Sequence, residues 1–370
     1  MNSSQRYLAL DVLRGITIAF MITVNNPGSW EYIFSPLEHS KWHGCTPTDL
    51  VYPFFLFVVG VSMFFSFSKY NNSLNKESLL KIGKRTLLIF AIGLFLNAFP
   101  QALTDFSKLR IMGVLQRIAI AYGFAALIAL AVPRKWLPLA GVSILLLYWG
   151  ILSWFGVGDP YSLSGNAVIP LDKAILGESH MYKGFGIPFE PEGLLSTVPA
   201  IVTVIIGYLT GGLIKQTEAV KVPQKLVIFG IAGVLVGYLW GLQFPINKPL
   251  WTSSYVIYAA GWALLSLALL IWMIDIKGWS RWTSFFVVFG MNPLAIFAFS
   301  GLYVKSILRL VHIPQPDGSV ANGYTWIFQH IFSPLCTDQK IASLLFALGH
   351  IVFFWLVGWV LYKKKIFIKV

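Results

Sequence analysis

The chain has 370 residues, of which 56% are hydrophobic and only 12% are charged, whereas roughly 25% are charged in a typical soluble domain. One soluble core could not bury so much apolar surface, and apolar runs long enough to cross a bilayer recur along the chain. The composition therefore predicts an integral membrane protein. The net charge of +13 does not indicate a nucleic-acid partner, because the excess lies in short connecting segments, where it suits anionic lipid headgroups.

Ten apolar runs predict an all-α, polytopic membrane helix bundle with residues 1–370 in a single domain. None of these runs has the short alternating pattern of a membrane-spanning strand. Asp11 and Arg14 interrupt the first run and no small-residue cleavage site follows it, so we expect a retained helix rather than a signal peptide. The predicted spans cover residues 8–26, 50–68, 86–102, 113–132, 137–156, 193–214, 226–242, 253–274, 283–303 and 341–362.

Lysines and arginines are unequally divided between the two sides that these spans would define. If the N-terminus is cytoplasmic, its side collects the basic segments 69–85, 134–135, 215–225, 277–281 and 363–369. The opposite side holds far fewer basic residues. Because cytoplasmic loops carry the excess of Lys and Arg, we expect both termini to be cytoplasmic.

Three polar segments on the predicted outer side are too long to be simple connections: residues 27–49, 157–192 and 305–340. They contain aromatic residues, prolines and histidines rather than low-complexity polar tracts, which is not typical of disorder. We expect them to fold over the outer mouth of the bundle and to recognise an acceptor there.

A polar turn from His39 to Asp49 precedes the second apolar run. Titratable side chains at the mouth of a membrane helix are costly, so function explains them better than packing does. An imidazole can accept a proton near neutral pH, and Asp49 could hold the imidazole of His39 in the required tautomer. His43, in the same turn, is a competing candidate.

Two arginines and one asparagine are candidates for binding a donor. Arg110 and Arg117 bracket the start of the fourth run, where the planar guanidinium suits a phosphate or pyrophosphate. The alternative for Arg117 is a structural ion pair with Asp11 or Asp49. Asn25 ends the first run, and its amide could hold a thioester carbonyl or a sugar hydroxyl, or simply belong to a turn.

Later cues are weaker. Proline in a membrane helix frees a backbone carbonyl, so Gly290 to Pro293, which include Asn292, predict a break at a ligand or a plain kink. Glu192 precedes the sixth run and could bind an acceptor or cap the helix. Metal-ligand spacings such as Cys-x-x-Cys are absent from the sequence, which predicts no metal. Cys45 and Cys336 both fall on the predicted outer side, and the sequence does not pair them.

Several motifs follow one another in a recognisable order along the whole chain. They are Leu10-Asp-Val-Leu-Arg-Gly, Val24-Asn25, His39-x-x-Trp42-x-Gly44, Asp49-Leu-Val-x-Pro-Phe, Arg110-Ile-x-Gly-Val-Leu-Gln-Arg, Glu190-Pro-Glu-Gly, Asn247-Lys-x-Leu-Trp-Thr-Ser-Ser-Tyr, Gly290-Met-Asn and Leu361-Tyr-Lys-Lys-Lys-Ile-Phe. Together they resemble the transmembrane catalytic domain of the heparan-alpha-glucosaminide N-acetyltransferase family, whose bacterial relatives include some labelled N-acetylglucosamine-related transporters.

The resemblance implies transfer of an acetyl group from cytoplasmic acetyl-CoA to a glucosamine-like amino sugar or glycan across the membrane. It places the active-site histidine at His39, with Asp49 beside it. We expect the donor to be bound by Asn25, Arg110, Arg117 and Asn292, and the acceptor by Trp42, His43, Glu192 and Trp251. It further implies a bacterial inner-membrane protein with the active-site loop in the periplasm. By analogy with the family, we expect a homodimer.

Two readings of other classes stay open at this point. An amino-sugar transporter would account for the membrane spans, although the two halves of the sequence show little internal symmetry. A structural membrane component without chemistry is the other alternative. Within the enzyme reading, His39 could act as a base or could carry the acetyl group itself.

Overall fold

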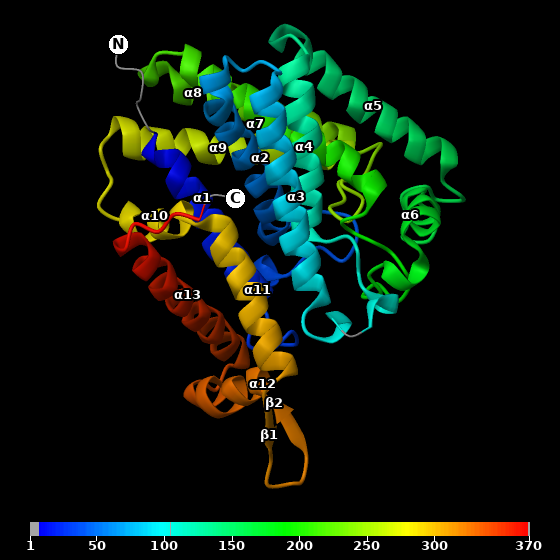
Figure 1. The fold of residues 1–370 in the computed structure, drawn as a ribbon, viewed down its shortest axis with the longest axis vertical. Helices are drawn as coiled ribbons and strands as arrows, with labels where there is room; N and C mark the ends of the chain where they lie inside the picture. The colour runs from blue at the N-terminus through cyan, green and yellow to red at the C-terminus, as the bar shows by residue number, and fades with distance from the viewer. Residues whose placement is uncertain (1–6, 104, 369–370) are drawn as a thin grey trace.

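The computed structural model describes residues 7–103 and 105–368, and within these the chain is mostly helical with one short β-hairpin (Figure 1). Residues 1–6 and 369–370 lie outside the described part. The cytoplasmic position expected for the two termini therefore stays a prediction. The helices are α1 Leu8–Asn25, α2 Pro47–Phe67, α3 Lys76–Ala98, α4 Val114–Ala131, α5 Leu137–Phe155, α6 Val168–Leu176, α7 Leu194–Gln216, α8 Val222–Gly241, α9 Ser253–Leu270, α10 Thr283–Met291, α11 Pro293–Arg309, α12 Gly323–Ile327 and α13 Gln339–Lys363.

Eight of the described helices are long and apolar enough to cross a bilayer: α1, α2, α4, α5, α7, α8, α9 and α13. Helices α10 and α11 would form a ninth span if they are counted together. The expected number of ten is therefore not confirmed. The difference is α3, which matches the predicted span 86–102 but begins at Lys76 and carries Lys81, Lys84 and Arg85 within its length.

Helices α10 and α11 are separated at Asn292 and bend by 80°. Pro293 opens α11 and has no backbone N–H, so the helical hydrogen-bond ladder cannot run through it. The break expected at Gly290 to Pro293 is confirmed.

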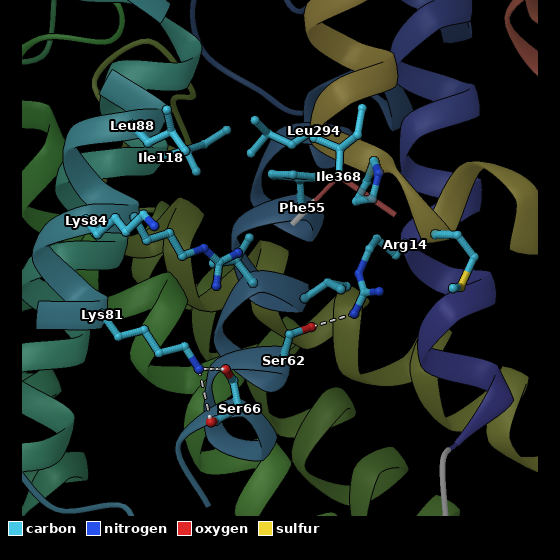
Figure 2. Close-up of a pocket in the computed structure, with 15 residues that line it drawn as sticks. Arg14, Phe55, Ser62, Ser66, Lys81, Lys84, Leu88, Ile118, Leu294 and Ile368 are labelled. Atoms are coloured by element: carbon cyan, nitrogen blue, oxygen red, sulfur yellow. Dashed lines mark hydrogen bonds between the residues drawn. The ribbon is translucent and has the colours of Figure 1, made fainter. Parts of the chain in front are cut away.

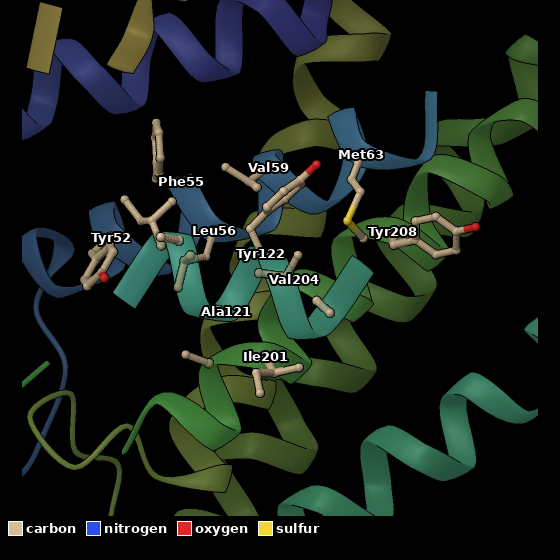
Figure 3. Close-up of a cluster of buried hydrophobic side chains, with 14 of the residues drawn as sticks. Tyr52, Phe55, Leu56, Val59, Met63, Ala121, Tyr122, Ile201, Val204 and Tyr208 are labelled. Carbon is tan, nitrogen blue, oxygen red and sulfur yellow. The ribbon is translucent and has the colours of Figure 1, made fainter. Parts of the chain in front are cut away.

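Helices α2, α4 and α7 form the centre of the bundle. Figure 3 shows side chains from all three helices in this core: Val59 of α2 lies beside the ring of Tyr122 of α4, and Tyr52 lies further along α2. The backbones of α2 and α7 touch at two glycines. A Cβ atom at Gly60 would lie 2.0 Å from the carbonyl oxygen of Val204, and one at Gly207 would lie 2.0 Å from that of Phe57. Small residues at such crossings are typical of membrane bundles, where close packing replaces the hydrophobic effect.

The periphery has the opposite character. Fewer than a third of the residues in the apolar stretches of helices α5, α8 and α13 are buried inside the structure, which suits contact with lipid. Helices α11 and α13 extend away from the bundle as an arm, with α12 and the hairpin at its far end (Figure 1). The hairpin pairs β1 His312–Pro314 antiparallel with β2 Val320–Asn322. Cys336, in the arm, and Cys45 are both free thiols.

The three polar segments predicted on one side do meet at one end of the bundle. The indole N–H of Trp42 donates to the carbonyl of Tyr161 at 2.8 Å, which joins segments 27–49 and 157–192. The hydroxyl of Tyr324 donates to the carbonyl of Pro27 at 2.7 Å, which adds the segment 305–340. The structure does not show which end faces the cytoplasm, and the orientation stays a prediction.

Candidate active site

Asp49 lies in the first turn of α2 and is 1% exposed. One carboxylate oxygen, Oδ2, accepts hydrogen bonds from the backbone N–H of Ser40 at 3.0 Å and from the N–H and hydroxyl of Thr46, each at 3.1 Å. The backbone part of this arrangement is a capping box, which satisfies N–H groups that have no partner inside the helix. The local rules for starting a helix therefore fix the position of this carboxylate.

The other oxygen, Oδ1, lies 2.7 Å from Nδ1 of His39. A carboxylate that accepts three further hydrogen bonds is best satisfied as an anion, so Nδ1 of His39 carries the hydrogen and donates it. This leaves the lone pair on Nε2, and 45% of the His39 side chain is exposed. An imidazole held in this way can accept a proton or attack a carbonyl carbon. The expected pairing of His39 with Asp49 is thus present in the structure.

Lys248 is a third member of this group that the sequence did not single out. Its Nζ lies 3.1 Å from Nδ1 of His39 and 3.4 Å from Oδ1 of Asp49. Because Nδ1 of His39 is a donor, Lys248 makes its favourable contact with the carboxylate. Burial lowers the pKa of Lys248, although Asp49 and Glu192 oppose this by attraction.

The loop that carries Lys248 is fixed by its neighbours. Asn247 is fully buried, and its amide donates to the carbonyl of Trp42 at 2.9 Å while its oxygen accepts from the N–H of Leu250 at 2.8 Å. Trp42 packs edge-on against Phe185 and Phe189. Trp42, which belongs to the turn from His39 to Asp49, is therefore held among aromatic rings.

His43 occupies a different environment from His39. Its Nδ1 lies 3.4 Å from the amide nitrogen of Asn247, and burial lowers its pKa although Asp159 opposes the effect. A carboxylate partner like that of His39 is not found for it among the described residues. His43 is thus a neighbour of the pair and lacks the group that would orient it as a base.

Arg110 is bound by two carboxylates in the loop before α7. Its Nε donates to Glu190 at 2.9 Å, and its Nη2 donates to Glu190 at 2.5 Å and to Glu192 at 2.6 Å. Burial raises the pKa of Glu190 against the attraction of Arg110. For Glu192, burial is the largest single effect and acts in the same upward direction, but the combined attraction of Arg110, Arg117 and Lys248 lowers its pKa. Arg110 and Glu192 are therefore brought together, with the charge of the arginine already compensated.

Arg117 and Trp251 form a buried stack. Arg117 is 1% exposed, and its guanidinium lies 4.9 Å from the ring centre of Trp251, which is fully buried. The guanidinium donates to the carbonyl of Pro191 at 2.6 Å and to the hydroxyls of Ser196 and Thr197. The start of α7, rather than Asp11 or Asp49, holds this arginine.

The two asparagines expected to meet the donor lie in different places. Asn25 is the last residue of α1 and is exposed. Helix α1 packs against α2. Asn292 is fully buried at the kink between α10 and α11. Its amide bonds to the backbone of Ile366 and Ile368 near the end of the chain.

A cavity of about 490 Å³ lies among α1, α2, α3, α4 and the start of α11. Figure 2 shows Lys81 and Lys84 of α3 reaching toward Arg14 of α1 across this space, with apolar residues such as Leu88 and Leu294 at one end. Its described lining includes four cationic side chains and no acidic one. They are Arg14, Lys81, Lys84 and Arg85.

Most hydrogen bonds of the cations in this cavity go to neutral oxygen atoms. Arg14 donates to the hydroxyl of Ser62 at 2.6 Å and pairs with Asp11 at 3.2 Å. Lys81 donates to the carbonyl of Ser66 at 3.3 Å. The buried Nε of Arg85 has no hydrogen-bond partner in the described part of the chain. Such an unsatisfied donor is costly without an anion to accept from it.

Helix α2 joins the cavity to the histidine. Phe55, Ser62 and Ser66 of α2 line the cavity, and Asp49 stands on the same helix six positions before Phe55, about 9 Å along the axis at the rise of an α-helix. Sequence reasoning missed the cavity. The signal was the run of basic residues from Lys76 to Arg85, which was interpreted only as a marker of the cytoplasmic side.

The fold and the site define a class: a polytopic helical membrane protein with a histidine–carboxylate pair at one end and a cationic cavity inside the bundle. Residues 6–163 match the family model of the catalytic region of heparan-alpha-glucosaminide N-acetyltransferase. That range contains His39, Asp49 and all four cationic residues of the cavity.

Curated relatives agree with this match. The chain is 27% identical to the mouse heparan-alpha-glucosaminide N-acetyltransferase over 354 residues, covering 80% of this chain and 53% of the mouse protein. For the human protein the identity is 29% over 349 residues, covering 79% of this chain and 52% of the human protein. The chain thus spans about half the length of these relatives. The resemblance to this family predicted from the motifs is confirmed.

Proposed function

We propose that the chain is an acetyl-CoA-dependent N-acetyltransferase of the membrane, which transfers the acetyl group to a glucosamine-like amino sugar or glycan. The observation that carries the proposal is the His39–Asp49 pair, in which Nε2 of His39 keeps its lone pair. Asp49 stands on the helix that also lines the cationic cavity. The names of the relatives support the same chemistry.

The donor site in this proposal is the cationic cavity. Coenzyme A carries several phosphate charges on its nucleotide and a long, mostly neutral arm that ends in the thioester. Arg14, Lys84 and Arg85 suit the phosphates, because guanidinium and ammonium groups form charge-assisted hydrogen bonds with them. The neutral part of coenzyme A that carries the thioester would then follow α2 toward Asn25 and His39. Arg110 and Arg117, first considered for this role, support the acceptor side in this proposal.

The acceptor site lies over the turn that carries His39. Trp42 offers a partly exposed aromatic face to a sugar ring, and Glu192 offers a carboxylate to the ammonium group of an amino sugar. His43 borders the same site. Trp251 is fully buried, so its contribution is to hold Arg117 and the α7 start beneath the acceptor.

Two routes fit the chemistry of the pair. In the first, Nε2 of His39 removes a proton from the amine, whose nitrogen attacks the thioester carbonyl carbon; the C–S bond breaks, and the leaving thiolate takes the proton from His39. In the second, Nε2 attacks that carbon itself, the C–S bond breaks and coenzyme A leaves as a thiolate; the amine nitrogen then takes the acetyl group from Nε2, and the proton that the amine loses passes to the released Nε2. Asp49 stabilises the positively charged imidazole in both routes.

The positive-inside pattern supports a donor site on the cytoplasmic side and an acceptor on the outer side. A bacterial inner membrane and a homodimeric assembly are part of the proposal because the resemblance to the family implies them. The bent α10–α11 pair favours the competing transporter reading, because broken helices are frequent in transporters. Proteoliposomes with labelled acetyl-CoA on one side and glucosamine on the other distinguish the two. The proposal expects N-acetylglucosamine to form on the acceptor side. Uptake of unmodified amino sugar without acetyl-CoA would overturn it.

A further inference from the structure

Residues 364–368, which follow α13, fold back onto the bundle. After α13, the N–H of Lys365 bonds to the carbonyl of Tyr362 at 3.0 Å and that of Ile366 to the carbonyl of Leu361 at 2.9 Å. Lys365 has a φ of 56°. This is the reversed turn that often closes a helix, here with lysine at a position that normally favours glycine. The turn redirects residues 366–368 toward the kink between α10 and α11.

The side chain of Asn292 makes two hydrogen bonds to the backbone of this returning segment. Its amide nitrogen donates to the carbonyl of Ile366 at 2.9 Å, and its amide oxygen accepts from the N–H of Ile368 at 2.8 Å. The Asn292 side chain is fully buried, whereas Ile366 and Ile368 are 44% and 48% exposed, so these two bonds are partly buried. A lysine in the left-handed region is strained, and the two hydrogen bonds to Asn292 oppose that strain.

The segment held in this way reaches the cationic cavity. Ile368 lines it beside Pro293 and Leu294, and in Figure 2 Ile368 lies close to Arg14 and Leu294 at one side of the space. Asn292 itself is not among the residues that line the cavity. Its amide groups are directed to the backbone of the tail.

We infer that Ile368 forms a wall of the donor site and that Asn292 is the positioning residue that holds residues 366–368, and with them this wall, in place. The inference rests on the proposed function for the identity of the ligand, an acyl-CoA thioester, but not for the wall. Asn292 acts on the donor through the tail and does not touch it. Losing the two bonds frees the tail and opens the cavity beside Arg14.

The test measures how easily a reagent enters the cavity, and it needs no bound ligand. Ser62, which bonds to Arg14 in the cavity, is changed to cysteine in a background where Cys45 and Cys336 are serine. The rate of modification by an anionic thiol reagent is then measured with Asn292 intact, in Asn292→Ala, and in a chain ending at Lys365. Asn322→Ala is the matched control, because Asn322 caps α12 at the far end of the arm. Free coenzyme A is added in parallel to each sample.

We expect Asn292→Ala and the shortened chain to be modified about tenfold faster than the parent, and to bind coenzyme A about tenfold more weakly, the size of two modest hydrogen bonds. Asn322→Ala should match the parent. Equal modification rates in the parent and in the shortened chain would overturn the inference, whether or not Asn292→Ala folds. Faster modification without any protection by coenzyme A would retain the wall and overturn the proposed donor.

Discussion

The Nζ atom of Lys248 lies 3.1 Å from Nδ1 of His39, although the two residues are 209 positions apart in the chain. Both atoms approach the same carboxylate oxygen of Asp49. A buried carboxylate with a hydrogen-bonded imidazole and a nearby cation is held in one orientation and one charge state. The lysine therefore stabilises the arrangement in which Nε2 of His39 is the free, reactive nitrogen.

Removing the cation at position 248 should impair transfer. We expect Lys248→Met to lower kcat by about tenfold to a hundredfold, because an orienting charge next to a catalytic base is lost. Lys248→Arg, which keeps the charge, should retain most of the activity. Steady-state kinetics with labelled acetyl-CoA measure both variants, and a Lys248→Met enzyme as active as its parent would remove Lys248 from the account.

The same lysine predicts an alkaline limb in the pH profile. Because burial lowers the pKa of Lys248 below its usual 10.5, against the attraction of Asp49, the cation is lost as the pH rises through that lowered value. Activity should then fall at a pH below 10.5, and in Lys248→Arg the fall should move to higher pH because arginine stays charged. Identical alkaline limbs in the two proteins would contradict this assignment.

The cationic cavity predicts selective effects on donors. Arg85→Gln and Lys84→Gln should each weaken binding of acetyl-CoA about tenfold, by loss of charge-assisted contacts with phosphate. A short acetyl thioester without the nucleotide should be used equally well by variant and parent. Lys135→Gln is the control, because Lys135 lies before α5 and outside the cavity. Equal losses for both donors would place the phosphates elsewhere.

Asp172 predicts a pH dependence of stability. It is fully buried in the short helix α6, and burial raises its pKa from 3.8 to about 6, although the N–H groups of Leu194 and Leu195 oppose this by donating to Oδ1. Between these values the folded protein keeps a proton that the unfolded chain has lost. Raising the pH through this window therefore costs the folded state up to about 3 kcal/mol.

Asp172→Asn provides the comparison, because the amide does not titrate. The melting temperature of the parent in detergent should fall relative to Asp172→Asn between about pH 4 and about pH 6, and the difference should then level off. Melting temperatures that change in parallel over this range would show that Asp172 does not titrate there.

The sequence predicted those parts of the site that depend on short separations. His39 and Asp49 are ten positions apart around the start of one helix, and capping rules bring them together. The kink at Asn292 follows from the missing N–H of Pro293. Both features are local consequences of residue type.

Long-range packing decided what the sequence could not predict. Lys248 reaches the histidine only because Asn247 anchors its loop to Trp42. The cavity exists because α3 extends beyond its apolar part, so that the partly buried Lys81 and Arg85 line it together with Arg14 of α1. Arg117 was expected to meet a ligand or an aspartate, but its partners on α7 become neighbours only in the folded bundle.

The central claim is that His39 carries the transfer, and a pair of histidine variants tests it most directly. Acetylation of glucosamine from labelled acetyl-CoA is measured for His39→Ala and for His43→Ala, which removes an imidazole from the same turn. The account predicts a loss of about a hundredfold to ten-thousandfold for His39→Ala, the usual contribution of a general base, and less than about a tenfold loss for His43→Ala. Transfer at the parent rate by His39→Ala would contradict it.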